Sequence, residues 1–376
     1  MPLGYCPAML MALRNIATPN SATEKITSAG ALYAVLDPQN YQGQRIEDGL
    51  STGTGHRLGV DATDSAMYAG VDTLGKPVVN LKYYAPNQGT IQSLKDCGGS
   101  VAPVITETSF AMQFYKQKTL KFRFATLARL CEDATKQFVA GSGNSIQKWG
   151  LNTPTMNEVA MVIEGEMRGL VAAINADILT RLVSGIGVNA ASGDALTRVV
   201  DVINADGSPN YLGYNTLLTD WMLNEAVGKP IIVGGTTFNS FAMLQKWACC
   251  NNSGIDWNAA FNSNPMMPYF DPVADTALGA GQFLMIAPGS VQFVKHNFYK
   301  SYEMYGRKFG TSEYGTMVDR RLPGIEFDIE VREVNCPDPF LEVVISLNYD
   351  LFVNPATFGA GDVLTGNRGV YRYTAT

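Results

Sequence analysis

The sequence predicts an α+β fold, and three observations lead to this class. One stretch of unbroken helical periodicity covers residues 153–183. Long β-rich runs lie before and after it, within 76–124 and 324–353. Between the helix and the second group of strands, residues 190–295 alternate strand-like and helical pieces. We therefore expect strands and helices to be grouped in separate parts of the chain, with a compact α+β domain at 190–295.

The first 65 residues mix small, polar and turn-forming side chains and end in the glycine-rich stretch DGLSTGTGHRLG. They show no sustained helical or strand period, which predicts an extended N-terminal arm.

Two β-rich runs follow, KPVVNLKYYAP at 76–86 and SFAMQFYKQKTLKFRF at 109–124, joined by a turn-rich segment at 87–103. We predict one long two-stranded hairpin from this pattern. The second run places basic residues among aromatic ones: Lys116, Lys118, Lys121 and Arg123. Such interleaving can contact single-stranded nucleic acid. Because the chain is acidic overall, pairing with acidic side chains of a protein is the favoured interpretation.

The helix at 153–183 has apolar side chains at steps of three or four, which places them on one face. Pro154 suits the first turn, and Ser184 with Gly185 ends the run. Glu164 with Arg168, and Asp177 with Arg181, are predicted i,i+4 ion pairs on the wetter face. At about 1.5 Å per residue the helix is roughly 40 Å long, which indicates a structural spine.

The last third of the sequence returns to strands. Residues 324–334 alternate apolar with charged side chains, so one face is predicted to be core and the other charged. A second strand is predicted at 340–353, and NCPDP at 335–339 forms a proline-stiffened turn between the two. The tail at 354–376 is predicted to be loosely structured.

Composition narrows the function classes. The 376 residues are 46% hydrophobic and only 16% charged, which favours a large core and extensive contact with other protein. A net charge of −6 argues against a protein whose main task is to read nucleic acid. The six cysteines show no metal-binding spacing and are interpreted as reduced thiols. We expect neither a signal peptide nor a membrane-spanning helix, because no basic region precedes the short apolar piece at the start and no apolar run is long enough to span a membrane.

Catalytic and metal-binding patterns are not found in the sequence. The two histidines, His56 and His296, belong to no nucleophile or metal motif. The stretch IIVGGTTFNSF at 231–241 resembles a strand, a Gly-Gly turn and a helix start, where backbone N–H groups can hold a phosphate. It lacks the lysine of a phosphate-binding loop, so a tight turn capped by Thr236 or Thr237 is the favoured reading. We expect no cofactor, no metal and no catalytic residue.

The order of these elements resembles the major capsid proteins of tailed phages, the Hong Kong 97-type fold that encapsulin shells share. The stretches FLMIAPGSVQFV at 283–294, GTMVDRRLPGIEFDIEV at 315–331 and LNYDLFVNP at 347–355 resemble the C-terminal strands of that family. The resemblance covers about residues 30–355. It implies a division into N-terminal arm 1–65, extended hairpin loop 66–125, peripheral domain with the spine helix 126–190, axial domain 191–295, returning peripheral strands 296–355 and C-terminal tail 356–376.

The resemblance also implies a function and partners. The chain would be a non-enzymatic major capsid protein that assembles with itself, as pentamers and hexamers, into the icosahedral shell around double-stranded DNA. Its place would be the virion capsid, assembled in the host cytoplasm, with no membrane contact. Portal, scaffolding and decoration proteins, and non-specifically contacted DNA, are further expected partners. The start of the sequence lacks a long charged scaffolding segment, so a separate scaffolding protein, or none, is implied.

Candidate intersubunit residues follow from the same resemblance: Lys95, Lys116, Lys118, Lys121, Arg123, Trp257, Phe261, Tyr269, Pro337, Asp338 and Pro339. Lys95 and Asn354 lie in segments where some family members form a covalent cross-link, although cross-linking is not expected here. Two alternatives stay open. One is an encapsulin-like shell that holds protein cargo, and the other is a soluble α/β enzyme that binds a phosphorylated ligand at Gly234-Gly235.

Overall fold

The protein was analysed as a computed structural model. The residues that it describes are 26, 28–37, 60–61, 68–84, 105–123, 153–189, 197–205, 210–224, 226, 230–240, 268–298, 308–309, 312–319, 321–322, 325–334, 340–354 and 368–376. The predicted turn at 335–339 lies outside these ranges.

The chain forms two compact units, each assembled from three separate stretches. Unit 1 consists of Met1–Ile26, Phe114–Ile174 and Lys295–Tyr349. Unit 2 consists of Thr27–Gln113, Asn175–Val294 and Asp350–Thr376. The finer division into six segments stays a prediction.

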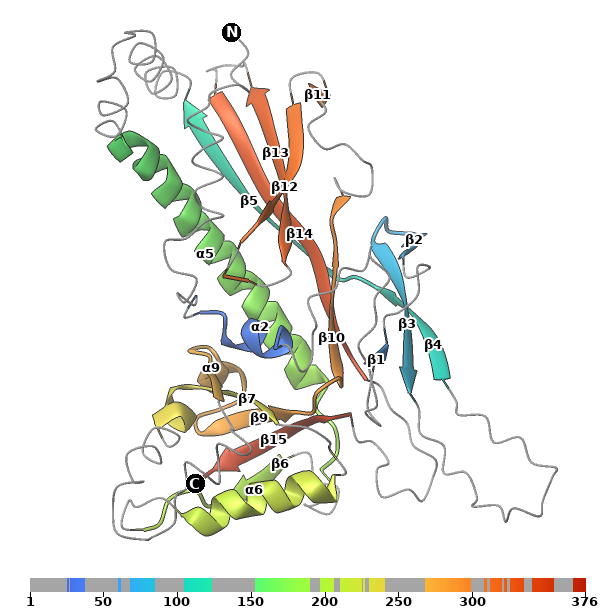
Figure 1. Ribbon diagram of the computed structural model, residues 1–376, viewed down its shortest axis with the longest axis vertical. Coiled ribbons are helices and arrows are strands. Elements are labelled where there is room, and N and C mark those ends of the chain that lie inside the picture. The colour runs from blue at the N-terminus through green and yellow to red at the C-terminus, as the bar shows by residue number, and fades with distance from the viewer. Residues whose placement is uncertain are drawn as a thin grey trace, which may run out of the picture. The chain divides into compact units, whose positions relative to one another are not determined.

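A six-stranded sheet contains the long strands of the protein (Figure 1). Its order is β10-β14-β13-β12-β11, and β5 also pairs with β14. The strands are β5 (Phe114–Arg123), β10 (Val291–His296), β11 (Lys308–Phe309), β12 (Ser312–Val318), β13 (Glu326–Val334) and β14 (Phe340–Val353). The predicted strand at 340–353 is therefore confirmed with its bounds. β14 is antiparallel to both β13 and β5, so it is central where it faces them.

The alternation predicted for β13 is present, but its charged face is also buried at the start of the strand. Ile325 and Phe327 are fully buried, and so is Asp328 on the opposite face. The Asp328 carboxylate accepts hydrogen bonds from Asn297 Nδ2 at 3.2 Å and from the Phe298 backbone N–H at 2.9 Å. These donors satisfy the carboxylate, which explains how a charged residue is accommodated there.

The spine helix is α5, Thr153–Ser184, one residue longer than predicted. The members of the predicted apolar stripe from residue 163 onward are buried: Ile163, Met167, Leu170, Ile174, Ile178 and Leu182. The predicted ion pair between Glu164 and Arg168 forms at 2.9 Å. Arg181 binds Asp350 through Nε at 3.0 Å, a partner 169 residues away that local spacing did not indicate.

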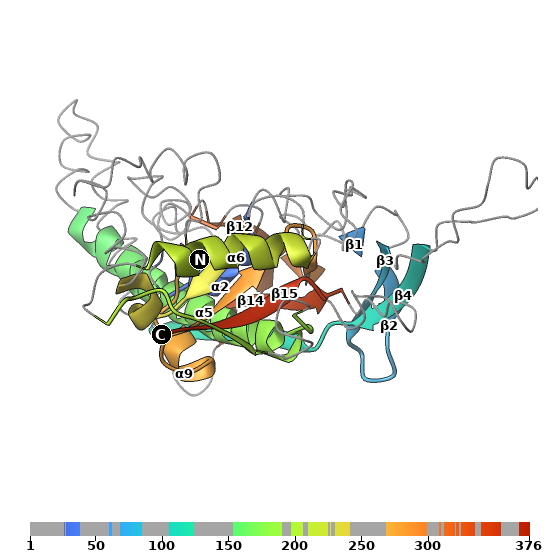
Figure 2. The ribbon, with the colours of Figure 1, turned by 90° about the horizontal axis from the view of Figure 1, so that it is seen from below.

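Unit 2 contains a five-stranded mixed sheet in the order β6-β15-β9-β7-β8. The strands are β6 (Thr197–Val200), β7 (Ile231–Gly234), β8 (Pro268–Phe270), β9 (Gln282–Ile286) and β15 (Val370–Ala375). Helix α6, Tyr211–Leu223, runs along the sheet beside β6 and β15 (Figures 1 and 2). Its Leu217 and Trp221 belong to the same buried cluster as Phe283 and Tyr371 of the sheet.

The C-terminal residues contradict the prediction of a loosely structured tail. β15 lies between β6 and β9, parallel to the first and antiparallel to the second. Its Val370, Tyr371 and Tyr373 are fully buried, and the Phe283 and Tyr373 rings stack with centroids 5.5 Å apart. The strand has only six residues, too few for its period to stand out in the sequence.

Part of the predicted N-terminal arm is also a packed element. Residues Gly30–Val35 form the short helix α2, and all six are buried. The first N–H groups of the helix are bound by side chains distant in sequence: Ala31 N–H donates to Asp271 Oδ2 and Leu32 N–H to Asn175 Oδ1, both at 2.9 Å. At Gly30 a Cβ atom would lie 2.1 Å from the Phe270 carbonyl oxygen, so this position requires glycine. Burial without a local cap explains why the helix was not predicted.

Replacing Asp271 with Ala is expected to lower the free energy of unfolding of unit 2 by about 3 kcal/mol or more, because buried donors each cost about 1–3 kcal/mol when left unpaired. The Asp271 carboxylate accepts from Ala31 N–H and from Asn175 Nδ2, the latter at 2.7 Å, and both contacts are buried. Urea unfolding followed by circular dichroism measures the loss. Asp72→Ala is the control, since Asp72 accepts two backbone N–H bonds in an exposed turn. An equal loss in both variants would contradict the role of burial.

The predicted hairpin exists, but its second strand ends earlier than expected. β3 (Pro77–Tyr84) pairs antiparallel with β4 (Ile105–Ala111), and β1 (Val60–Asp61) and β2 (Tyr68–Val71) pair with β3. The run 109–124, predicted as one strand, is divided at Met112 and Gln113, and its second part is β5 in the six-stranded sheet. Continuous β-propensity does not reveal where a chain changes sheets.

Candidate intersubunit surfaces

The base of the β3–β4 hairpin is fixed by one buried carboxylate and an apolar cluster. The Asp350 carboxylate accepts from the Gln113 backbone N–H at 2.8 Å and from Arg181 Nε and Nη2 at 3.0 and 3.1 Å. Burial raises the pKa of Asp350 above its ordinary value, and the hydrogen bonds from Gln113 and Arg181 partly oppose that rise. The cluster consists of Val79, Leu81, Met112, Val294 and Phe352, with Phe110 packed against it.

The basic residues predicted as contact candidates lie on β5, and the three whose side chains are described, Lys116, Lys118 and Lys121, are divided between both faces of the strand. Lys118 is paired in register with Ile345 of β14, and Lys121 with Glu342. A spacing of three residues places two side chains on opposite faces of a strand, because the side-chain period is two. Lys116 shares the face of Lys118 for the same reason. The intersubunit role of these residues stays a prediction.

Two of these lysines have acidic partners within their own chain. Lys118 Nζ lies 3.0 Å from Glu166 Oε2 on α5. Lys121 Nζ lies 3.8 Å from Glu342 Oε1, whose other oxygen contacts Arg332 on β13. Glu342 thus lies between two cations on a ladder across three neighbouring strands. The pair of Lys118 with Glu166 is exposed on both sides, so it contributes roughly 0–1 kcal/mol and Lys118 can exchange partners at low cost. In the pair of Lys121 with Glu342 only the lysine is exposed, whereas the carboxylate is buried.

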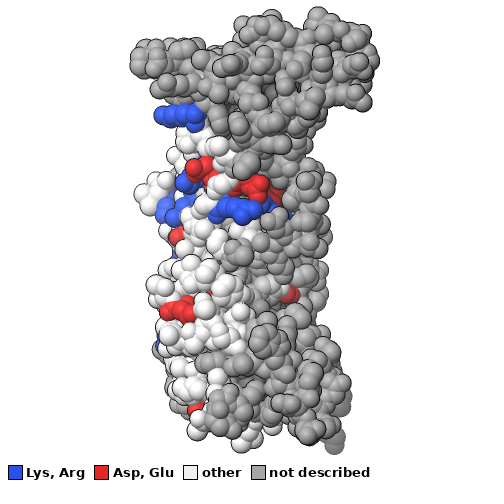
Figure 3. Space-filling model, turned by 90° about the vertical axis from the view of Figure 1, so that its left-hand side faces the viewer, with Lys and Arg blue, Asp and Glu red and all other residues white. Residues whose placement is uncertain are grey.

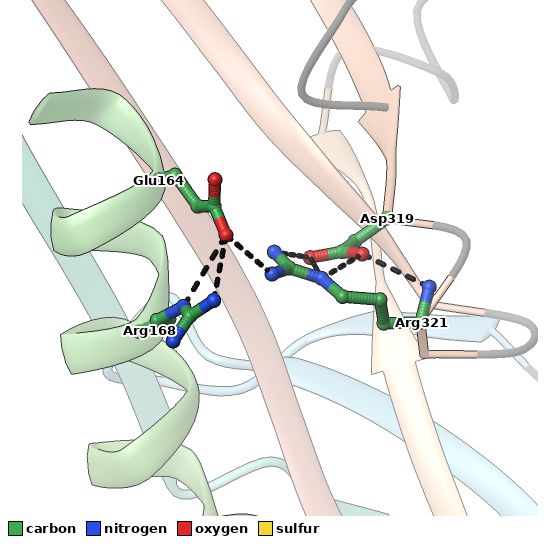
Figure 4. Close-up of polar contacts among 4 residues, drawn as sticks. All are labelled: Glu164, Arg168, Asp319 and Arg321. Carbon is green, nitrogen blue, oxygen red and sulfur yellow. Dashed lines mark hydrogen bonds and ion pairs between the residues drawn. The ribbon is translucent and has the colours of Figure 1, made fainter. Parts of the chain in front are cut away.

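A second charged network connects α5 to the segment between β12 and β13 (Figure 4). Arg321 binds the fully buried Asp319 carboxylate through Nη2 at 2.7 Å, and its Nη1 lies 2.9 Å from Glu164 Oε1. Glu164 also binds Arg168, so two cations share one carboxylate. The hydrogen bond to Asp319 raises the pKa of Arg321 above its ordinary value. Figure 3 shows such acidic and basic side chains side by side in one band of the surface.

The glycine turn at Gly234-Gly235 packs against the Asp275 side chain of the same chain. Thr237 N–H donates to Asp275 Oδ2 at 3.2 Å, where Asp275 belongs to the short helix α9, Ala274–Ala277. A Cβ atom at Gly235 would lie 2.3 Å from the Asp275 carboxylate, and one at Gly234 would lie 2.4 Å from the Phe238 ring. The two glycines are therefore explained by close packing. A carboxylate at this helix start disfavours a phosphate in the same place, because the two anions would repel each other.

Of the other candidate residues, only Tyr269 is described. It lies on β8, and its hydroxyl donates to Asp37 Oδ2 at 2.5 Å. Burial and the neighbouring Asp37 together raise the pKa of Tyr269 well above its usual range. The hydroxyl thus faces its own chain. The remaining candidates lie outside the described residues and stay predictions: Lys95, Trp257, Phe261, Pro337, Asp338 and Pro339.

Helix α6 presents an uncharged outer face that the sequence reasoning missed. Leu212 and Met222 are 73% and 77% exposed, and Leu223 is exposed beside them. The hydroxyls of Thr216 and Thr219 donate to carbonyls of their own helix at 2.9 and 3.1 Å. The only charged residue of the helix, Asp220, is buried against Arg198. The absence of Lys, Arg and Glu from YLGYNTLLTDWML was the available signal, and an exposed apolar face is typical of a protein contact.

No metal or membrane site is found in the described part of the chain. Its His, Cys, Asp and Glu side chains form no group of three or more suited to a metal ion. None of the helices within these residues is long and apolar enough to cross a membrane.

Comparisons with known proteins give matches among solved structures. No protein-family model matches the sequence, and no curated protein matches it. The chain is similar to a chain of the cyanophage A-1(L) capsid, with 10% identity, a TM-score of 0.42, and coverage of 79% of this chain and 87% of that one. It is also similar to a chain of the cyanophage P-SCSP1u capsid, with 8% identity, a TM-score of 0.40, and coverage of 82% and 85%.

A third match is the virus-like particle from Pyrococcus furiosus, with 8% identity, a TM-score of 0.35, and coverage of 92% of this chain and 98% of that one. All three belong to capsids or virus-like particles.

Proposed function

We propose that this chain is the major capsid protein that assembles with itself into the icosahedral shell around the double-stranded DNA genome of a tailed phage. The observation that supports this most is the order of its elements. A hairpin precedes a 32-residue helix, an inserted α/β sheet follows, and the chain then returns to a 14-residue strand. This is the order that the resemblance to Hong Kong 97-type capsid proteins implies.

The chemistry of the described residues agrees with a structural role. The buried carboxylates Asp271, Asp319 and Asp350 are each bound by cationic or N–H donors of the same chain. Such groups hold elements together and are not available to a substrate. The uncharged face of α6 adds exposed apolar surface of the kind that protein contacts use. We therefore propose that the protein carries no catalytic activity.

Two further contact regions belong to the proposal. The apolar stretch 249–270, with Trp257 and Phe261, would face a neighbouring subunit near the fivefold or sixfold axis. The turn Pro337–Pro339 would lie at a threefold or local threefold contact, where two prolines fix its shape at low entropic cost. In an assembled structure, the accessible area of these residues should fall when neighbouring subunits are added. An unchanged area would contradict the assignment.

Electron microscopy of the expressed and purified chain tests the function directly. We expect closed icosahedral shells, formed by the chain alone or with a separate scaffolding protein. A chain that stays monomeric in both conditions and binds nucleotide saturably would instead support the enzyme alternative at Gly234-Gly235. Neighbouring genes distinguish the two kinds of shell. Terminase, portal and protease genes indicate a phage capsid, and a single cargo enzyme indicates an encapsulin-like compartment.

A further inference from the structure

Asp350 lies at a point where the chain passes from one compact unit to the other. Gln113 is the last residue of unit 2 before the chain enters unit 1. Asp350, which lies within β14, is the first residue after the chain returns to unit 2. The hydrogen bond from Gln113 N–H to Asp350 Oδ2, at 2.8 Å, joins these two positions. Asp350 is fully buried, whereas the Arg181 side chain that binds it is 31% exposed.

The same residues form the base of the β3–β4 hairpin. β4 ends at Ala111, two residues before Gln113, and Met112 N–H donates to the Pro77 carbonyl at the start of β3. The Gln113 side chain accepts from Lys76 Nζ at 2.8 Å and donates to the Ala111 carbonyl at 3.0 Å. Backbone and side chain of Gln113 therefore connect both hairpin strands to the Asp350 carboxylate.

The apolar contacts at the hairpin base define the direction of the hairpin less closely than the hydrogen bond from Gln113 to Asp350 does. Phe110 meets Phe352 edge to face, with ring centroids 5.4 Å apart, and Val79, Leu81 and Met112 complete the cluster with Val294. Apolar packing is not directional, and side chains in such a cluster can slide. A hydrogen bond and a two-point Arg–carboxylate contact fix both distance and angle.

We propose that Asp350 is a positioning residue that sets the direction in which the β3–β4 hairpin leaves its base. Arg181 holds the carboxylate in place from α5, and the carboxylate holds the Gln113 backbone. Without the ion pair, the cluster of Val79 and Phe352 keeps the hairpin attached, but the hairpin samples several directions. In a shell, a loop that reaches a neighbouring subunit would then lose its fixed orientation. Only this last consequence rests on the proposed function.

The variant Asp350→Asn tests the inference, because it keeps the side-chain shape and removes the charge that binds Arg181. Hydrogen exchange of full-length subunits, held unassembled and checked by sedimentation velocity, measures opening of the backbone. Amides in 77–84 and 105–111 should exchange faster by about tenfold, because they belong to a locally released element. Amides of β9 and α6 should keep the exchange rates of the unmodified chain.

Asp220→Asn is the matched control. Asp220 is a buried carboxylate of the same unit, bound by an arginine, Arg198 Nε, at 3.0 Å. Burial raises its pKa as it does that of Asp350. This pair joins β6 to α6, and neither residue belongs to the hairpin strands or to their base, so its loss should leave hairpin exchange unchanged. A second variant, Arg181→Met, removes the same ion pair from the other side if Asp350→Asn fails to fold.

Unchanged hairpin exchange in the Asp350 and Arg181 variants would overturn the inference. So would an equal rise across β9, α6 and the hairpin, since that pattern indicates general loss of stability. An assembly assay separates this inference from the proposed function. If the unmodified chain forms no shells, the proposed function fails, while the exchange result still decides the role of Asp350.

Discussion

A chain that ends at Gly369 is expected to lose the fold of its five-stranded sheet. β15 pairs with β6 on one side and β9 on the other, so its removal separates β6 from the rest of the sheet. The same truncation removes Val370, Tyr371 and Tyr373, which are fully buried in the core of unit 2. Truncating one large buried aromatic side chain to Ala costs about 3–5 kcal/mol. The free energy lost with the whole strand is therefore comparable to the roughly 5–15 kcal/mol by which a typical domain is stable.

Circular dichroism and thermal unfolding of the truncated chain measure this effect. Arg372→Ala is the control, because the Arg372 side chain is half-buried and its Nε donates to the Thr197 hydroxyl at the sheet edge. It should shift the melting temperature only slightly. A truncated chain that melts like the full chain would contradict the central position of β15.

Elements whose signal is local were predicted well. The apolar stripe of α5 is set by the 3.6-residue period, and positions from Ile163 to Leu182 are buried as that period requires. β14 was predicted with its bounds because a long apolar run between turn residues has few alternatives. The ion pair of Glu164 with Arg168 follows from i,i+4 spacing in the same way.

Elements that depend on distant partners were missed. β15 is a strand because β6 and β9 lie on its two sides, and α2 is a helix whose first N–H groups are bound by Asn175 and Asp271. The residues next to β15 and α2 in the sequence do not indicate these distant partners. The step from β4 to β5 was missed for a related reason, since Met112 and Gln113 lie within a continuous run of strand-forming residues.

The candidate surfaces show the same division between local and distant signals. The opposite faces of Lys118 and Lys121 follow from a spacing of three residues on a strand, so this feature could be predicted from the sequence. The contacts of Arg321 with Glu164 and of Arg181 with Asp350 could not be predicted from local spacing. Glu164 and Arg321 are 157 residues apart, and each side chain has several possible partners until the fold selects one.

Shortening residues 87–103 to a tight turn is expected to leave the subunit folded and to prevent shell assembly. The hairpin strands outside this segment keep their own support, because β3 and β4 pair from Val78 with Ala111 to Tyr84 with Ile105. Val79 and Leu81 also remain in the apolar cluster at the hairpin base. The pairing with β1 and β2 adds to this, so the strands do not depend on a neighbour for stability, as an isolated hairpin would.

What the shortened chain loses is reach toward an adjacent subunit. The resemblance to capsid proteins implies that the loop lies over a neighbour, in a contact repeated around closed rings, so that small energies per contact add up across a shell. Circular dichroism should show an unchanged fold, and sedimentation velocity should show subunits or small oligomers in place of shells. Replacing 87–103 with a glycine–serine segment of equal length is the control that separates length from sequence. If the shortened chain forms normal shells, the segment has no role in assembly, and the subunit contacts must come from surfaces such as the outer face of α6.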